Sequence, residues 1–397
     1  MRLHLVFDHR FVRGADGVVR SSKHYGHAFF AKRYLRAFDA VTILARVAEG
    51  GADEVRGEPT EGPGVTLVSL GDWQGPLGLA RVGHRVRGEI GRHLSGADAV
   101  LLIAPGMLAS LAHRWLTPWG QPYGIEVVGD PYDAMAPASM KHPLRPLLRW
   151  SATRELRRLC ADAAAAAYVT REALQRRYPC SGWAVGVSDV ELSAGAFADG
   201  PRATLPRDGR RTLVTVGTMA QLYKAQDVLI DAVTACVRDG VDVGLVLVGD
   251  GRFRDALERR AAEAGLGDRV RFAGAQPAGA AVRAVLDTSD VFVLPSHQEG
   301  LPRAMVEAMA RGLPCIGSTV GGIPELLPAE DLVPPGDVAA LAARIREVVG
   351  DPARLRRMSE RNLDAARRYR EDLLDEQRLA FYAHLRSVTE ARARRVA

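Results

Sequence analysis

Short apolar runs rich in β-branched residues alternate along this chain with stretches of helical period. In the first half they read RLHLVFD, AVTILARV, VTLVSL, AVLLIA, GIEVVG and AAAYVT, and in the second half RTLVTVG, GLVLVG, RVRFAG, VFVLP and LPCIGST. Almost continuously apolar runs, each followed by a helical pattern, indicate parallel sheets covered by helices on both faces. The two series predict an α/β protein with two doubly wound, Rossmann-like domains.

The segment AGAFADGPRATLPRDGRR, residues 194–211, separates the two series, because Gly, Pro and Asp there displace the periodic apolar residues. We expect an N-terminal domain over residues 1–195, a linker over 196–210 and a C-terminal domain over 211–375. Residues 376–397 are expected to form a C-terminal helix that is able to pack back on the first domain. A chain of 397 residues has the length of two domains.

Composition narrows the class of protein. The chain is 47% hydrophobic and 25% charged, has no run near the roughly 20 apolar residues of a membrane span, and begins without the pattern of a signal peptide. Its four cysteines are far apart and lack metal-ligand spacing, which favours free thiols in a reducing compartment. We therefore expect a cytoplasmic protein, and because no acidic metal pair stands out, we expect neither a metal nor a cofactor.

The net charge of +6 and the pI near 9.3 favour anionic partners. The charge is spread along the chain: residues 1–200 hold 24 basic and 20 acidic residues, and the rest hold 29 and 27. Proteins that bind nucleic acid usually concentrate their charge on one face, so we expect no nucleic-acid partner.

One segment is locally basic. MKHPLRPLLRWSATRELRRLC sets one acidic residue, Glu155, against six basic ones: Lys141, Arg145, Arg149, Arg154, Arg157 and Arg158. Two interpretations stay open. The segment contacts an anionic membrane or a phosphorylated acceptor, or it is a solvated helix face, which is the more common case.

In open α/β sheets, ligands bind at the carboxyl ends of the strands, in loops that lead to helix N-termini. VFVLPSHQEGLPRAMVEAMARGLP has this form: a strand, a loop with Glu299, and a helix predicted to have Pro302 in its first turn and to end before Gly312. A helix N-terminus suits a phosphate. Glu299 is either beside that anion or a capping carboxylate.

Glu307 lies further along the same helix and has two interpretations. Arg303 and Arg311 stand four residues before and after it, which would make an exposed Arg–Glu–Arg ladder. Alternatively, its carboxylate accepts hydrogen bonds from the two hydroxyls of a ribose.

Two further strand ends carry candidate residues. STVGGIPE places Gly321 and Gly322 where their amides would face a phosphate or a sugar, or where a tight turn needs them. In LVTVGTMAQLYKAQDV, Gly217 ends a strand and Lys224 precedes a helix, where it either neutralises a diphosphate or faces solvent.

Taken together, these motifs resemble the family 4 retaining glycosyltransferases of the GT-B fold, in which two Rossmann-like domains face a central cleft. The resemblance rests on VGTMAQLYKAQDVLIDA, VLVGDGRFRDALERRAAEAGLGDRVRFAG and DVFVLPSHQEGLPRAMVEAMARGLPCIGSTVGGIPELL, and covers most of residues 212–327. It implies transfer of a sugar from a nucleotide-diphosphate sugar to an acceptor hydroxyl, with retention by front-face attack.

Carried over by position, the resemblance implies a role for each candidate. Glu299 contacts hydroxyls of the donor sugar and is not a nucleophile, Lys224 binds the diphosphate, and Glu307 binds the ribose. The loop Ala275–Pro277 lies beside the nucleobase. The resemblance also implies that the N-terminal domain binds the acceptor and the C-terminal domain binds the nucleotide sugar. The remaining donor contacts come from Gly217, Thr218, Gly300, Leu301, Pro302, Arg303, Gly321 and Gly322.

Three departures from the family pattern are visible. Thr218 stands where the family often has an arginine that shares the diphosphate. The first loop has Gly14 and Gly17 apart instead of a Gly-Gly pair, with Gly17 retained as a donor contact. Asp130, in GIEVVGDPYDAM, stands where a histidine commonly faces the donor sugar; Asp130 followed by Pro131 is equally a standard turn or helix start.

The acceptor side is less defined. Residues 10–26 form the first loop, in which Arg13, His24 and Tyr25 are candidate acceptor or phosphate contacts. The acceptor itself is a carbohydrate polymer, a lipid-linked saccharide or a small molecule. Two other classes stay open at this stage: a GT-B-like nucleotide-sugar epimerase or pseudo-glycosyltransferase, and a non-catalytic binding protein.

Overall fold

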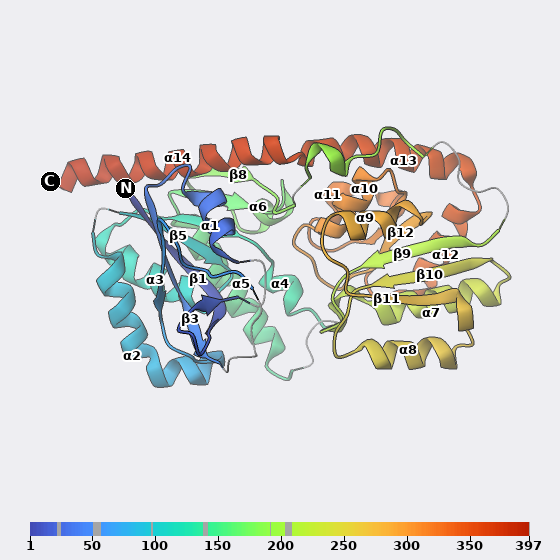
Figure 1. Cartoon of the computed structure of the whole chain (residues 1–397), viewed down its shortest axis with the longest axis horizontal. Coiled ribbons are helices and arrows are strands. Elements are labelled where there is room, and N and C mark those ends of the chain that lie inside the picture. Colours follow the sequence, from blue (N-terminus) through green and yellow to red (C-terminus); the bar gives the residue numbers. More distant parts are fainter. Residues whose placement is uncertain are drawn as a thin grey trace.

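The computed structural model describes residues 1–21, 25–50, 57–96, 98–137, 142–190, 192–202 and 209–396. Two parallel sheets, each flanked by helices, stand side by side as two domains (Figure 1). The fold is therefore the two-domain α/β architecture that the alternating pattern predicts.

The N-terminal sheet has the order β4-β3-β1-β5-β6-β7-β8; these strands are parallel, and β2 pairs antiparallel with β1. All residues of β5 are buried, as expected of a strand covered on both faces. The periodic pattern missed β2, which is very short, and β8, whose residues are exposed or half-buried at the sheet edge. The strands are β1 (Arg2–Arg13), β2 (Val19–Arg20), β3 (Ala40–Glu49), β4 (Val65–Ser69), β5 (Ala99–Ala104), β6 (Gly124–Val127), β7 (Ala165–Tyr168) and β8 (Trp183–Gly186).

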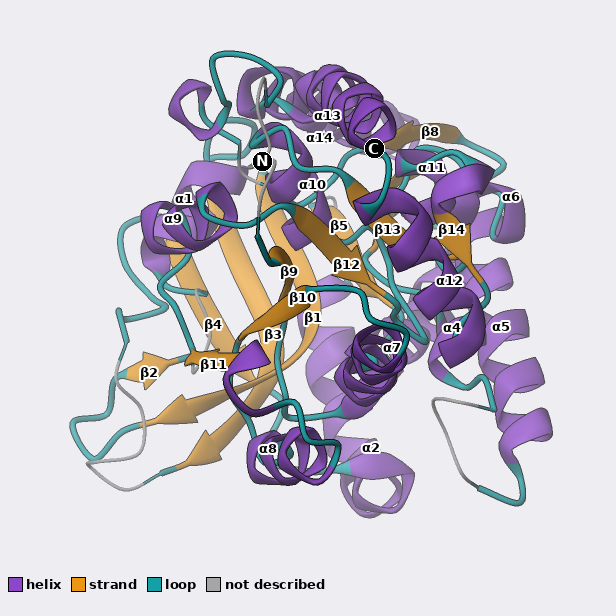
Figure 2. Ribbon diagram, turned by 90° about the vertical axis from the view of Figure 1, so that its right-hand side faces the viewer, coloured by secondary structure: helices purple, strands orange, loops and turns teal. Residues whose placement is uncertain are grey.

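Helices pack on both faces of this sheet and bury two apolar clusters against it (Figure 2). The helices of this domain are α1 (His27–Tyr34), α2 (Gly75–Leu94), α3 (Met107–Leu116), α4 (Pro131–Ala134), α5 (Arg145–Ala161) and α6 (Ala173–Arg177).

The C-terminal sheet is parallel throughout its described strands and has the order β11-β10-β9-β12-β13-β14. Its strands are β9 (Arg211–Val216), β10 (Val243–Val248), β11 (Val270–Gly274), β12 (Val291–Leu294), β13 (Cys315–Ser318) and β14 (Leu332–Val333). Its helices are α7 (Gln226–Arg238), α8 (Arg254–Glu263), α9 (Ala280–Asp287), α10 (Arg303–Ala310), α11 (Ile323–Leu326), α12 (Val338–Val349) and α13 (Pro352–Ala366). Of the expected linker, residues 203–208 lie outside the described residues.

The last helix, α14 (Glu371–Val396), leaves the C-terminal domain and runs along the N-terminal domain (Figure 1). The expected domain boundary at residue 375 thus falls inside this helix. Phe381 and Leu385 are buried in the same cluster as β1 and β3 side chains. Gly124 in β6 permits this approach, because a Cβ there would lie 2.9 Å from Leu385 Cδ2. None of the helices in the described ranges has both the length and the apolar character needed to cross a bilayer.

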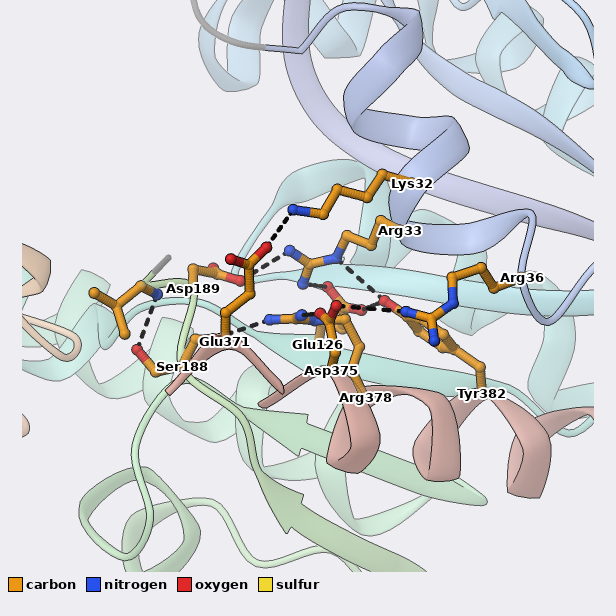
Figure 3. A network of polar contacts seen from close by, with 11 residues as sticks. Lys32, Arg33, Arg36, Glu126, Ser188, Asp189, Glu371, Asp375, Arg378 and Tyr382 are labelled. Carbon is orange, nitrogen blue, oxygen red and sulfur yellow. Dashed lines mark hydrogen bonds and ion pairs between the residues drawn. The ribbon is translucent and has the colours of Figure 1, made fainter. Parts of the chain in front are cut away.

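A buried polar network fastens α14 to the N-terminal sheet (Figure 3). Arg33 Nη2 donates to Glu126 Oε2 at 2.8 Å and Arg33 Nη1 donates to Asp189 Oδ1 at 2.9 Å. The hydroxyl of Tyr382 donates to Glu126 Oε1 at 2.7 Å and accepts from Arg33 Nε at 3.1 Å. Burial alone would lower the pKa of Arg33, but Glu126, Tyr382 and Asp189 raise it well above its usual range.

We expect Arg33→Met to lower the free energy of unfolding by about 3–5 kcal/mol, because it leaves the buried Glu126 carboxylate without its cation. Arg36→Met, two residues beyond the end of α1, is the matched control. Arg36 is exposed and pairs with Asp375 at 3.4 Å, so its loss should cost under about 1 kcal/mol. Denaturant unfolding followed by circular dichroism measures both variants, and equal losses would contradict the role assigned to the network.

Candidate active site

Three neighbouring strands of the C-terminal sheet end at the edge that faces the N-terminal domain. β9, β12 and β13 are adjacent in the sheet, so the loops that follow them lie side by side. The loop after β9 carries Lys224, the loop after β12 carries Glu299, and the loop after β13 carries Gly321 and Gly322. The structure therefore brings together candidates that are up to 98 residues apart in sequence, from Lys224 to Gly322.

Lys224 and Glu299 form an ion pair in this cluster. Lys224 Nζ lies 2.7 Å from Glu299 Oε1, which also accepts from Ser296 Oγ at 2.7 Å. The two side chains are 13% and 7% exposed, so the pair is largely removed from solvent. Sequence reasoning found both residues, but it did not predict that they contact each other.

The local backbone directs Lys224 to this position. Ala225 has φ 55°, an uncommon conformation for a residue other than glycine, and it joins the short 3-10 turn of Leu222–Lys224 to α7. Gly217 lies against the lysine, because a Cβ there would be 3.1 Å from Lys224 Cγ. Thr218 is exposed, and its Oγ1 accepts from Ala220 N at 3.1 Å.

Glu307 is half-buried in α10, so of its two interpretations the exposed Arg–Glu–Arg ladder is wrong, and its role toward a ribose stays a prediction. Arg311 forms its ion pair with Asp287 and not with Glu307. Its guanidinium donates to both carboxylate oxygens of Asp287, at 2.7 and 3.0 Å, because Asp287 lies at the nearby end of α9. Burial raises the pKa of Glu307, although the charges of Arg303 and Arg283 oppose that shift. Pro302, expected in the first turn, is the N-cap of α10.

Gly321 and Gly322 pack directly on the Glu299 loop. Gly321 has φ 53°, and a Cβ on it would lie 2.1 Å from Glu299 O, so only glycine fits. Gly322 N donates to Gly300 O at 2.6 Å, and Leu301 is buried beside them. Gly321 N donates across the domain interface to Asp133 Oδ2 at 3.2 Å.

Asp130 and Asp133 lie on the N-terminal side of the domain interface, at the start of α4. Asp130 N-caps α4, accepting from Tyr132 N at 2.8 Å, and it also accepts from Tyr178 Oη and contacts Arg177. These contacts match the helix-start interpretation; its role toward a sugar stays a prediction. Burial and the Asp130 charge raise the pKa of Asp133. Sequence reasoning missed Asp133, although it lies three residues after Asp130 in the same motif.

A second carboxylate crosses from one domain to the other. Glu325 in α11 accepts backbone hydrogen bonds from Arg171 N at 2.7 Å, from Glu172 N at 2.9 Å and from Ala173 N, at the start of α6. Gly300 also lies against this wall, since a Cβ there would be 3.2 Å from Val128 O. No motif singles out Glu325 beyond its place in the segment that follows β13.

The first loop lies partly within the described residues. Gly17 has φ 75° in the turn that joins β1 to β2, and Arg13 Nη1 donates to Gly17 O at 3.2 Å. Tyr25 packs on His9 with ring centroids 4.9 Å apart. Burial and the Asp189 charge raise the pKa of Tyr25, while Arg303 and Arg33 oppose the shift, so Tyr25 lies within electrostatic reach of α10. His24 lies outside the described residues.

The nucleobase and metal expectations stay untested. Ala275–Pro277 is exposed just after β11, and Gln276 Nε2 donates to Ala273 O at 2.8 Å. In the part of the chain that the structure describes, no group of three or more His, Cys, Asp or Glu residues is placed to hold a metal ion.

Comparison with known proteins identifies relatives of this arrangement. Residues 210–351 match the family described as Glycosyl transferases group 1. Protein CapJ of Staphylococcus aureus is 26% identical over 324 residues, which are 80% of this chain and 79% of CapJ. Other curated relatives are 33–40% identical, include glucosyl- and mannosyltransferases, and are matched over only 27–40% of their own length.

Solved structures share the fold over nearly the whole chain. Sucrose-phosphate synthase of Thermosynechococcus elongatus superimposes with a TM-score of 0.67 and 19% identity, covering 98% of this chain and 99% of that one. HepE of Anabaena, solved in complex with UDP-glucose, superimposes with a TM-score of 0.61 and 17% identity, covering 96% and 98%. Both domains and their arrangement therefore follow the GT-B pattern.

The raised pKa of Glu307 predicts a pH dependence for Glu307→Gln. The carboxyl of the folded protein has a pKa above the ordinary 4.5, so the folded state favours the protonated form. As the pH rises through the folded-state pKa, the wild type loses stability relative to the amide variant. The difference in unfolding free energy should therefore shift in favour of Glu307→Gln between about pH 4 and about pH 7, as measured by denaturant unfolding.

Glu360→Gln is the control for that measurement, because Glu360 is an exposed carboxylate paired with Arg356 at 2.9 Å. Its difference from the wild type should not move in the stabilising direction over the same range. A Glu307→Gln difference that stays constant with pH would contradict the burial of an uncompensated carboxylate.

Proposed function

Because residues 210–351 of this GT-B protein belong to the glycosyl transferases group 1 family, we propose that it is a retaining glycosyltransferase using a nucleotide-diphosphate sugar as donor and a hydroxyl as acceptor. One observation carries the proposal: the buried Lys224–Glu299 pair, 2.7 Å apart, at the strand ends that face the other domain. A cation and a carboxylate at one point suit a donor that is anionic at its diphosphate and hydroxylated at its sugar.

Lys224 stabilises the leaving group in this proposal. The diphosphate departs with negative charge, and an ammonium held in a largely water-excluded position interacts with that charge far more strongly than it would in bulk water. The N-terminus of α10, beside Gly300 and Arg303, adds backbone N–H groups and the positive end of the helix dipole. With these groups present, the proposed reaction needs no metal ion and no cofactor.

Glu299 orients the donor sugar. Lys224 and Ser296 both bind its Oε1, which leaves Oε2 without a hydrogen-bond partner among the described residues and available to sugar hydroxyls. Transfer is then a front-face reaction in which the acceptor oxygen forms the new bond to the anomeric carbon as the bond to the diphosphate breaks. A donor phosphate oxygen takes the acceptor proton, and Glu307 binds the ribose hydroxyls.

Thermal unfolding with a panel of UDP-, GDP-, ADP- and dTDP-sugars tests donor binding. UDP-glucose is the natural first member, since HepE was solved with that ligand. We expect one nucleotide class to stabilise the protein by about 2.7 kcal/mol at a hundredfold excess over Kd. Absence of stabilisation by any member of the panel would count against the proposal.

Lys224→Ala and Glu299→Ala should each lower transfer from the stabilising donor by at least about 100-fold, because each removes a group that acts on the reacting sugar or its leaving group. Radiolabelled donor and product analysis measure the loss, and circular dichroism verifies the fold. Arg238→Ala, at an exposed position of α7, is the control and should retain wild-type turnover. Wild-type-like turnover in either site variant would overturn the residue assignment.

A further inference from the structure

The first two turns of α5 lie outside the hydrophobic core. Residues 142–152 are all exposed or half-buried, and the buried side chains of α5 begin only at Thr153. Figure 2 shows α5 at the periphery of the molecule, and only its second half packs in the cluster against the N-terminal sheet. This half of the helix is therefore not stabilised by packing in the core, although it is rich in apolar residues.

Large apolar side chains are concentrated on this exposed half. Of the ten large hydrophobic residues that the described chain leaves exposed, four lie within residues 144–150. They are Leu144, Leu147, Leu148 and Trp150, exposed by 56%, 58%, 39% and 61%. Isolated surface hydrophobics need no explanation, but a group of four on two helical turns marks an interaction surface.

Helical geometry separates this surface from the core-facing side of α5. At about 100° per residue, Leu147 points opposite to the buried Leu156, and Trp150 points opposite to the buried Leu159, nine residues later in each case. By the same count, Arg154 and Arg158 lie within about 20° of Leu147. The outward face of α5 thus presents a leucine, a tryptophan and two arginines together.

The charges on this face lack acidic partners. Residues 142–154 contain no Asp or Glu, and no ion pair joins Arg154 or Arg158 to a carboxylate among the described residues. The guanidinium of Arg154 lies 5.7 Å from the ring centroid of Trp150, so the indole and the cation are held side by side. Exposed tryptophan and leucine beside unpaired arginine is the combination that binds the interface of an anionic bilayer.

The surface lies next to the candidate site. Arg149 in α5 donates to Tyr132 O at 2.7 Å and stacks on the Tyr132 ring, and Arg177 stacks on the same ring. Tyr132 belongs to α4, whose Asp133 accepts from Gly321 N across the domain interface. A flat partner held against α5 would therefore lie beside this interface.

We propose that Leu144, Leu147, Trp150, Arg154 and Arg158, here called the α5 surface, dock the protein on an anionic lipid bilayer. The leucines and the tryptophan enter the interfacial layer, while the arginines bind lipid phosphates. Docking rests on this surface alone. Its consequence, that the enzyme takes a lipid-linked acceptor from the bilayer, rests on the proposed glycosyl transfer.

Vesicle sedimentation of the full-length chain tests the docking. The wild type should sediment with vesicles that contain phosphatidylglycerol, sediment less with pure phosphatidylcholine, and be released by high salt. Leu147→Ser/Trp150→Ala and Arg154→Glu/Arg158→Glu should each lower the partition coefficient by at least about tenfold. No donor is present, so this result is independent of whether the protein transfers a sugar.

Matched variants control for a general loss of apolar area or charge. Trp119→Ala removes another exposed tryptophan, and Arg238→Glu/Arg259→Glu changes the charge equally on the C-terminal domain; both should bind vesicles like the wild type. Two sedimentation results would overturn the proposal: a wild type that does not sediment with the vesicles, or α5 variants that sediment as well as the controls. It would also be overturned if light scattering showed that the wild type forms oligomers through α5 and does not bind vesicles.

Discussion

The buried carboxylate of Glu126 is the constraint on which the arrangement of this molecule depends. It lies on β6 in the middle of the N-terminal sheet and needs compensation, because an unpaired charge in that position would cost several kcal/mol. Arg33 and Tyr382 provide it, and Tyr382 is on α14, a helix that starts at the C-terminal domain. The contacts that compensate the Glu126 carboxylate therefore anchor α14, the helix that links the two domains, on the N-terminal sheet.

The same strand connects this anchor to the interface between the two domains. β6 ends at Val127, and the next residues, Val128 to Asp133, form the N-terminal wall that meets Gly300 and Gly321. Glu325 adds three backbone hydrogen bonds from the other side. The strand ends of both sheets are thus held at one interface by directional polar contacts, which fix geometry more closely than apolar packing does.

Sequence reasoning reached the architecture because it depends on local patterns. Continuous apolar runs such as AVLLIA are buried on both faces, and the pattern of such runs gave the two parallel sheets. Glu299, Lys224 and the Gly321–Gly322 pair were found because strand ends can be read from the same runs. Long-range partners could not be found this way: nothing local indicates that Arg311 binds Asp287, that Asp133 reaches Gly321, or that Glu325 caps α6. The helix-period count also could not tell that Glu307 faces inward and is half-buried.

The contribution of the Lys224–Glu299 pair to folding stability does not explain why this protein contains it. A largely buried ion pair gains little net free energy over two well-packed apolar side chains, because desolvation offsets most of the attraction. The residues around the pair add further unfavourable free energy. Ala225 has a left-handed backbone, and Gly321 and Gly322 leave no room for a side chain. Folding stability therefore does not account for this arrangement. A ligand with an anionic and a hydroxylated part does account for it, because such a ligand would replace the interactions that the two side chains now make with each other. In the proposed function, the two side chains are already placed for the charge that glycosyl transfer develops.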